Sequence, residues 1–265
     1  SILMTYLKTL ISMIFILSLF VNHVNAGILM VSSDESLQGE GGVSIIKTYM
    51  DKNKMRVESG ENEVVIYHQD KGVFWALDNK AKTYTEMTKD DIKAMKSQMD
   101  EAMKRMQDQM KDLPPEQRQM VEEMMKGKMQ SEPAKTTFNK VASKVKVNQW
   151  TTDKYEGHRQ GSLEKEVWSA DMDELGLDDE SLQVMTGLSE FFKELSPDSN
   201  AVLKPGSKEW EKEMGYAGIP VKSIDYRDGQ KTGITEIKEI SKQDFPASMF
   251  EIPAGYKKMA NPQMR

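Results

Sequence analysis

Short runs of apolar and β-branched residues, each followed by turn residues, make up the chain between residues 43 and 85. The runs are rich in Val, Ile, Tyr, Phe and Trp, which favour strands, and Asp, Asn and Gly residues that suit tight turns separate them. Connections this short join antiparallel neighbours, so the pattern predicts an antiparallel meander. The expected strands are Val43–Tyr49, Lys54–Glu58, Glu63–His68, Val73–Leu77 and Lys82–Thr85.

A helical period replaces this alternation over residues 88–130, where apolar side chains recur at spacings of three, four and seven. Thr88 and Asp91 have the spacing of a capping box, which satisfies free amides of a first helical turn. Leu113-Pro114-Pro115 ends one helix, because proline lacks the amide, and Pro115 suits the start of the next. The segment is therefore predicted to be a helical hairpin, and it holds nine of the 21 methionines.

The strand pattern resumes after the hairpin. The expected strands are Thr136–Val147, Lys154–Arg159, Glu164–Ser169, Val221–Tyr226 and Thr232–Ile240, with a helix over Asp179–Leu195 and a closing tail over Met249–Tyr256. Many short strands and few helices, without a long linker, predict an α+β fold. We expect a single domain over residues 43–265, in which helices cover one face of a curved antiparallel sheet.

Residues 1–26 differ from the remainder of the chain, because Lys8 is their only full charge and an apolar run extends from Leu10 to Val21. Val24-Asn25-Ala26 offers the small residues of a cleavage site, so the segment is predicted to be a secretory signal peptide. An uncleaved anchor is the alternative, but the run is shorter than the roughly 20 residues of a membrane span. Residues 27–42, rich in Ser, Asp, Glu and Gly, are expected to form a flexible leader.

Composition narrows the classes of function. The 265 residues carry a net charge of −6 and include no cysteine. An acidic chain without a basic patch is a poor partner for nucleic acid. Without cysteine there are no disulfides, thiolate metal sites or thiol nucleophiles. We expect an exported protein of the bacterial periplasm, envelope or extracellular space that is not integral to the membrane once the signal is removed.

Candidate catalytic residues are few. His68 and His158 lack a second histidine or cysteine at a ligand spacing, and each is expected to lie on a strand surface. The chain has no nucleophile elbow, zinc-protease motif or phosphate-binding loop with its strand and helix. The sequence therefore predicts no enzymatic activity, no metal site and no cofactor.

The methionine-rich face has three interpretations. Methionine is an adaptable core filler, so packing alone explains the spacing. Flexible thioethers also suit the lining of a site for apolar ligands of variable shape. In the third interpretation, the thioethers of Met99, Met103 and Met106 bind a soft metal ion, Cu(I) or silver. For the second interpretation the predicted lining is Ile92, Met95, Met99, Met103, Met106, Met110, Met120 and Met124, with Trp75, Trp150 and Trp168 as aromatic walls.

Several short motifs carry a resemblance to a known family. They are Tyr49-Met50 before Lys54-Met55-Arg56, Trp75-Ala76-Leu77-Asp78 before Lys82-Thr83-Tyr84, the Leu113-Pro114-Pro115-Glu116-Gln117-Arg118 turn, and the ending Phe250-Glu251-Ile252-Pro253-Ala254-Gly255-Tyr256. With them the chain resembles a family of exported bacterial proteins catalogued as a domain of unknown function and related in fold to the LolA/LolB lipoprotein carriers. The resemblance implies an incomplete antiparallel β-barrel with helices over its open side and a cavity for acyl chains.

These observations lead to one main functional hypothesis and two alternatives. The main hypothesis is that an envelope protein binds or carries an apolar ligand, such as an acyl chain, a lipid or a lipoprotein, in a cavity under a methionine-rich helical cover. In the first alternative a structural or stress-related envelope protein binds another protein through the same face. The second is soft-metal binding. An apolar cavity would favour the carrier, and an exposed apolar patch would favour the protein-binding protein.

Overall fold

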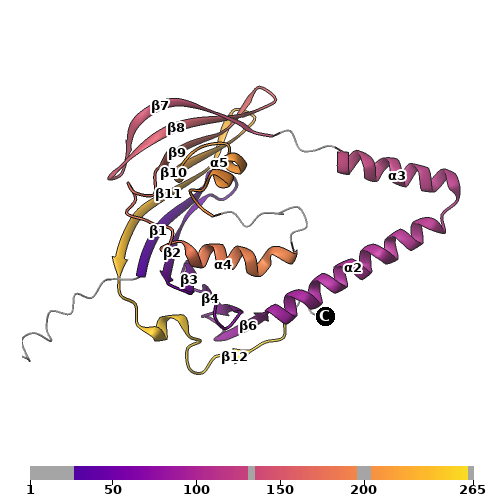
Figure 1. The fold of residues 1–265 in the computed structure, drawn as a ribbon, viewed down its shortest axis with the longest axis horizontal. Helices are drawn as coiled ribbons and strands as arrows, with labels where there is room; N and C mark the ends of the chain where they lie inside the picture. Colours follow the sequence, from indigo (N-terminus) through magenta and orange to yellow (C-terminus); the bar gives the residue numbers. More distant parts are fainter. Residues whose placement is uncertain (1–26, 131–134, 196–203, 262–265) are drawn as a thin grey trace, which may run out of the picture.

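The computed structural model describes residues 27–130, 135–195 and 204–261. The signal peptide predicted for residues 1–26 lies outside these ranges. The described residues form one sheet of 12 strands in the order β12-β6-β5-β4-β3-β2-β1-β11-β10-β9-β8-β7. The sheet is curved, and helix α4 (Gln183–Phe192) lies on its concave side (Figure 1). Helix α5 (Lys208–Met214) ends at Met214, which packs with Tyr155 and Val167 of the second half of the sheet. The predicted curved α+β sheet is confirmed.

The first half of the sheet is the meander expected from the sequence. Each strand from β2 to β6 pairs antiparallel with the next along the chain. The bounds are β2 Gly42–Asp51, β3 Lys54–Ser59, β4 Glu63–His68, β5 Val73–Asp78 and β6 Thr83–Thr88. The short strand β12 (Lys257–Lys258) joins the edge beyond β6 in parallel orientation, so the chain returns to the meander at its end.

The second half is also antiparallel and has the strands predicted after the hairpin. The bounds are β7 Thr137–Val147, β8 Trp150–Arg159, β9 Ser162–Ala170, β10 Ile219–Arg227 and β11 Gln230–Gln243. Strand β11 continues the sheet onto β1, which in turn pairs with β2. Strand β1 thus joins the two halves.

The flexible leader predicted for residues 27–42 is wrong. Gly27–Ser36 forms β1, a strand in the middle of the sheet, and Gly42 already belongs to β2. Ile28 is buried in the core, and a Cβ on Gly27 would lie 2.5 Å from the Gln243 carbonyl oxygen, so the strand needs glycine at its start. The polar second half is held by backbone hydrogen bonds from β11 and β2 on either side. Because β1 is hydrogen-bonded to a strand on each edge, it forms a strand without the alternating hydrophobic residues by which a strand is recognised in a sequence.

The predicted helical hairpin is present as α2 (Lys89–Lys111) and α3 (Pro115–Gln130). The capping box is formed: the Asp91 amide donates to Thr88 Oγ1 over 3.2 Å, and the Thr88 amide donates to Asp91 Oδ2 over 2.8 Å. The helix expected over Asp179–Leu195 is shorter, because it consists of α4 followed by the 3-10 turn η1 (Lys193–Leu195). Helix α5 was not expected, and the tail contains the 3-10 turn η2 (Ala247–Phe250).

Strand β4 shows how the two faces of the sheet are covered. Its side chains alternate, so Tyr67 belongs to the main core under α4, whereas Ile66 belongs to a second core on the opposite face. Phe250 of η2 is fully buried in that second core beside Trp75. Consequently both faces of the meander are buried, one by α4 and the other by the C-terminal tail. Of the helices in the described ranges, none combines the length and apolar character needed to cross a membrane.

The hydrogen bonds of Glu86 tie the C-terminal strand to the sheet and predict a pH dependence. Lys258 Nζ donates to Glu86 Oε2 over 2.8 Å, and Trp75 Nε1 donates to Oε1 over 3.0 Å. The bond from Lys258 is the largest cause of a lowered Glu86 pKa, followed by the bond from Trp75. A carboxyl whose pKa is lowered by folding stabilises the protein above its unfolded value of 4.5, and this stability is lost as pH falls through the lower folded value.

We therefore expect Glu86→Gln to lower the free energy of unfolding by about 1 kcal/mol at pH 7, since the amide keeps an acceptor but not the charge. Urea unfolding followed by tryptophan fluorescence at pH 7 and pH 3 measures this. The difference between the two proteins should shrink at pH 3. An equal difference in unfolding free energy at both pH values would contradict a stabilising role of the Glu86 charge.

Candidate binding surface

The methionines of α2 lie on one exposed stripe. Met99, Met103 and Met106 are spaced by four and three residues, so they share one helix face, and their side chains are 43–49% exposed. Met95 and Met110, which extend the stripe at either end, are half-buried. Exposed apolar side chains aligned on one helix face make this stripe a candidate binding surface.

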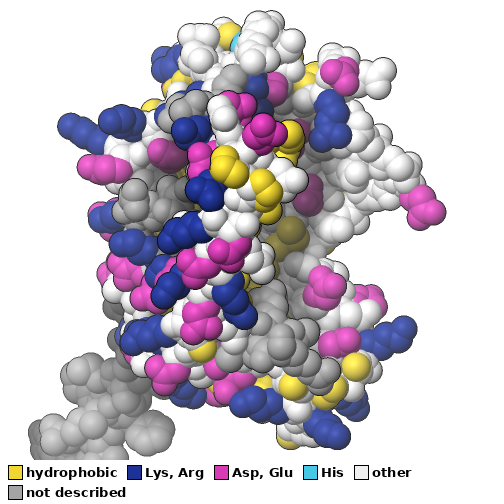
Figure 2. All heavy atoms as spheres, turned by 90° about the vertical axis from the view of Figure 1, so that its right-hand side faces the viewer, with side chains coloured by type: hydrophobic (Ala, Val, Ile, Leu, Met, Phe, Trp, Pro, Cys, Tyr) yellow, Lys and Arg dark blue, Asp and Glu magenta, His cyan; other side chains and the backbone are white. Residues whose placement is uncertain are grey.

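Helix α3 adds two further exposed methionines. Met120 and Met124 are 67% and 61% exposed, and they lie one turn apart. We call Met99, Met103, Met106, Met120 and Met124 together the methionine surface. Figure 2 views the molecule from the hairpin side and shows hydrophobic side chains in small groups bordered by Lys, Arg, Asp and Glu side chains. The methionine surface thus consists of exposed apolar side chains surrounded by charged side chains.

The hairpin does not lie over the sheet, unlike the helical cover expected from the sequence. Helix α2 packs against β6 and η1 at its N-terminal end, and Figure 1 shows it leaving the body from there, with α3 turning back toward β7. Ile92 anchors this end, because it is buried in the core with Phe191 of α4. The physical reason is that α4 already fills the concave face of the meander, so the space that the hairpin would cover is occupied.

The predicted aromatic walls are not brought together with the methionines. Trp75 is buried in the second core, on the far face of the meander from α4. Trp150 is buried in the main core. Trp168 is half-buried with the ammonium groups of Lys154 and Lys222 4.9 and 5.1 Å from its ring centroid. Trp168 also packs against the main core, whereas Trp75 lies in the second core, so the three tryptophans do not form one common wall.

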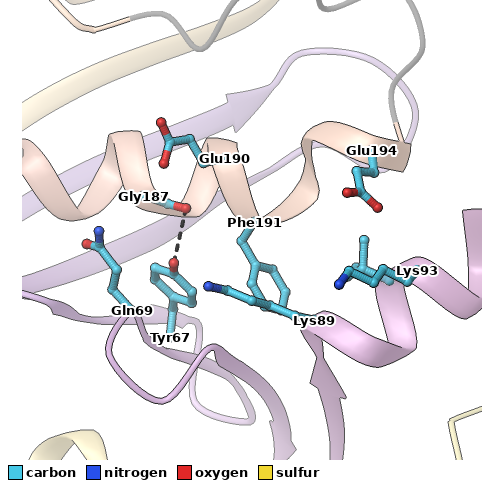
Figure 3. Close-up of a pocket in the computed structure, with 9 residues that line it drawn as sticks. Tyr67, Gln69, Lys89, Lys93, Gly187, Glu190, Phe191 and Glu194 are labelled. Carbon is cyan, nitrogen blue, oxygen red and sulfur yellow. Dashed lines mark hydrogen bonds between the residues drawn. The ribbon is translucent and has the colours of Figure 1, made fainter.

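A small cavity lies where the base of α2 meets α4 (Figure 3). Its volume is about 260 Å³, and its lining is Tyr67, Gln69, Lys89, Ile92, Lys93, Gly187, Glu190, Phe191 and Glu194. The Tyr67 hydroxyl donates to the Gly187 carbonyl oxygen over 3.0 Å, and burial followed by the Glu190 charge raises the pKa of Tyr67 to about 12. Tyr67 is thus a neutral donor that joins β4 to α4. Ile92 is the one predicted lining residue found here.

His68 is buried, which corrects the expectation that it lies on a strand surface. Its Nε2–H donates to the Phe250 carbonyl oxygen over 2.6 Å, so it connects β4 to η2. His158 is half-buried, with Nε2 4.0 Å from a Glu156 carboxylate oxygen. In the part of the chain that the structure describes, no group of three or more His, Asp or Glu side chains is arranged to hold a metal ion.

Comparison with known protein families gives a match for one part of the chain. Residues 181–256 match the family model of DUF4412, a domain of unknown function. The predicted resemblance to a family catalogued as a domain of unknown function is confirmed for this region. No protein with a curated description matches the chain.

Among solved structures, an uncharacterized conserved protein from Thermus thermophilus aligns at 8% identity and a TM-score of 0.42, covering 94% of this chain and 99% of that one. A LolA superfamily protein from Nitrosomonas europaea aligns at 6% identity and a TM-score of 0.29, covering 87% and 92%. Neither similarity bears on the function of this protein.

The DUF4412 region supplies one side of the cavity described above. Helix α4 lies within it, whereas Gln69 and the base of α2 lie outside it. The cavity was not predicted from the sequence, since Gln69, Lys89 and Lys93 are separated along the chain from the α4 residues that face them. The only sequence signal was that Lys89 and Lys93 lie one turn apart at the start of the apolar stripe.

Proposed function

We propose that this chain is an exported, non-catalytic protein that binds the acyl chains of a lipid or lipoprotein on the methionine surface. The observation that carries the proposal is the exposure of five methionines on the two helices of the hairpin. Thioether side chains are flexible and polarizable, so they adapt to a chain without fixed shape. The proposal differs from a carrier with an enclosed apolar chamber, because the ligand lies along a helix.

The attachment of the hairpin supports this proposal. Helix α2 is fixed at its base through Ile92 and its capping box, while the methionines lie several turns further along. Elements with few buried contacts open and shift at low free-energy cost. The hairpin is therefore suited to close over a bound acyl chain.

The same exposure favours one other candidate, a protein partner that docks an apolar surface on the hairpin. The two candidates differ in what accompanies the protein when it is isolated from cells. Native mass spectrometry with lipid extraction, on protein purified from its own envelope fraction without detergent, separates them. We expect co-purifying acyl species in stoichiometric amount. A protein that is empty of lipid at native expression, or that carries only a protein partner, would contradict acyl binding.

A further inference from the structure

The cavity at the base of α2 shares one residue, Ile92, with the apolar stripe of the same helix. Ile92 lines the cavity, and Met95, Met99, Met103 and Met106 follow it at spacings of three, four, four and three. These spacings keep all five side chains on one face. At 1.5 Å per residue the stripe from Ile92 to Met106 is about 21 Å long, which exceeds the roughly 15 Å of hydrocarbon in one bilayer leaflet. An acyl chain that starts at the cavity can therefore lie along the whole stripe.

The cavity itself is lined by charges. The side chains of Lys89 and Lys93 extend into the space between α2 and α4, and Glu194 extends toward Lys93 from η1, whereas Glu190 points away from the lysines (Figure 3). Within the described ranges no carboxylate oxygen lies within 4.0 Å of either ammonium group. The two cations therefore face the cavity without an ion-pair partner among the described residues.

Two neighbours make this arrangement more than a pair of surface lysines. The aliphatic stem of Lys89 lies over Gly72, where a Cβ would be 3.2 Å from Cε, so the turn between β4 and β5 directs the ammonium inward. Gln69 Oε1 is buried on the cavity wall and accepts no hydrogen bond from any described residue. A buried acceptor without a donor is unfavourable, and a donor on a bound group would satisfy it.

From these observations we infer that the cavity binds the polar head of the amphiphile whose acyl chain lies on the methionine surface, and that this head is zwitterionic. The anionic phosphate lies between Lys89 and Lys93, and a primary ammonium faces Glu194, at the other end of the cavity from Gln69 (Figure 3). A volume of about 260 Å³ is below the usual range for whole ligands, about 300–1,000 Å³, which suits a headgroup alone. The inference rests on the proposed function and specifies its ligand as a phospholipid with an amine in its head.

Calorimetric titration with three single-chain oleoyl probes tests the inference. The probes are lysophosphatidylethanolamine, which is zwitterionic, lysophosphatidylglycerol, which is anionic, and monooleoylglycerol, which is neutral, each below its critical micelle concentration. The double variant Lys89→Gln with Lys93→Gln should weaken both phosphate-bearing probes by at least about tenfold, because two charge-assisted hydrogen bonds are lost. Monooleoylglycerol should bind within about twofold of wild type, since its contacts are apolar.

Two further variants complete the design. Lys104→Gln with Lys111→Gln removes the same charge from α2 outside the cavity and should leave all three affinities unchanged. Glu194→Gln should weaken the zwitterionic probe by about threefold or more without weakening the anionic one. Equal effects of Glu194→Gln on both phospholipids would overturn the ammonium assignment, and an unchanged affinity in the Lys89 and Lys93 variant would overturn the whole site.

The neutral probe distinguishes failure of the headgroup site from failure of acyl binding. Binding of monooleoylglycerol without any discrimination between heads would contradict the headgroup site and leave acyl binding in place. Failure of all three probes to bind would contradict both.

Discussion

Replacing Met99, Met103 and Met106 together by aspartate is expected to abolish acyl binding while the fold is retained. Full burial of a methionine contributes about 1.5–3 kcal/mol, and these side chains are already about half buried, so about 1 kcal/mol each remains for a ligand. Three such contributions correspond to about 100-fold in affinity, and the carboxylates add the free-energy cost of their desolvation. Titration with a fluorescent fatty acid measures the loss.

Two control variants show whether the loss of binding comes from the apolar surface, from the sulfur atoms or from net charge. Leucine at the same three positions keeps the apolar surface and removes the sulfur, so acyl binding should persist, whereas soft-metal capture would disappear. Ser97→Asp with Lys104→Asp makes the same change of net charge on the opposite face of α2, where both residues are exposed, and should bind like wild type. Retained binding in the triple aspartate variant, or equal loss in the opposite-face variant, would refute the role of the methionine surface.

Phe250→Ala is expected to cause the largest loss of stability in this chain. The side chain is fully buried in the second core, against Trp75 and its neighbours, and it lies in a turn that His68 holds through the Phe250 carbonyl. Removing a buried phenylalanine costs about 3–5 kcal/mol, because burial is lost and a cavity remains. For a protein of this size the loss corresponds to a fall in Tm of roughly 10 °C.

The control for this prediction is Met259→Ala, which removes an apolar side chain that is about half exposed a few residues further along. Calorimetric melting of the three proteins compares them directly. We expect the Met259 variant to melt within about 1 °C of wild type, as is usual for surface changes. A loss of under 1 kcal/mol for Phe250→Ala would show that the tail does not stabilise the sheet.

The elements that the sequence predicted are those whose signal is local. The meander follows from short alternating runs between turn residues, and the hairpin follows from its period, its capping box and Pro114-Pro115. Strand β1 escaped prediction because its polar half is stabilised by partners distant along the chain, so nothing in Ser32–Ser36 itself resembles a strand. The burial of His68 has the same origin, since the residue that covers it is Phe250, 182 positions away.

In the candidate site, too, the features with a local signal were predicted from the sequence, and those that depend on distant contacts were not. The methionine face of α2 was evident from spacing alone, but whether it faces a core, a cavity or solvent depends on where the hairpin stands. That position is set by α4, whose Phe191 meets Ile92 and fills the concave face first. The tryptophans were grouped by residue type, and alternation along their strands instead sends Trp75 to the opposite face.

Methionine methyl NMR is the sharpest test of acyl binding at the methionine surface, because each thioether methyl group reports on its own surroundings. Protein labelled with ¹³C at the methionine methyl groups is titrated with a spin-labelled fatty acid, and single Met→Leu variants assign the signals. If the acyl chain binds there, we expect shifts and paramagnetic broadening at the methionine surface, with Met50 and Met55, buried in the main core, unaffected. Signals of the methionine surface that stay unchanged at saturating ligand would contradict acyl binding there, as would broadening confined to the core methionines.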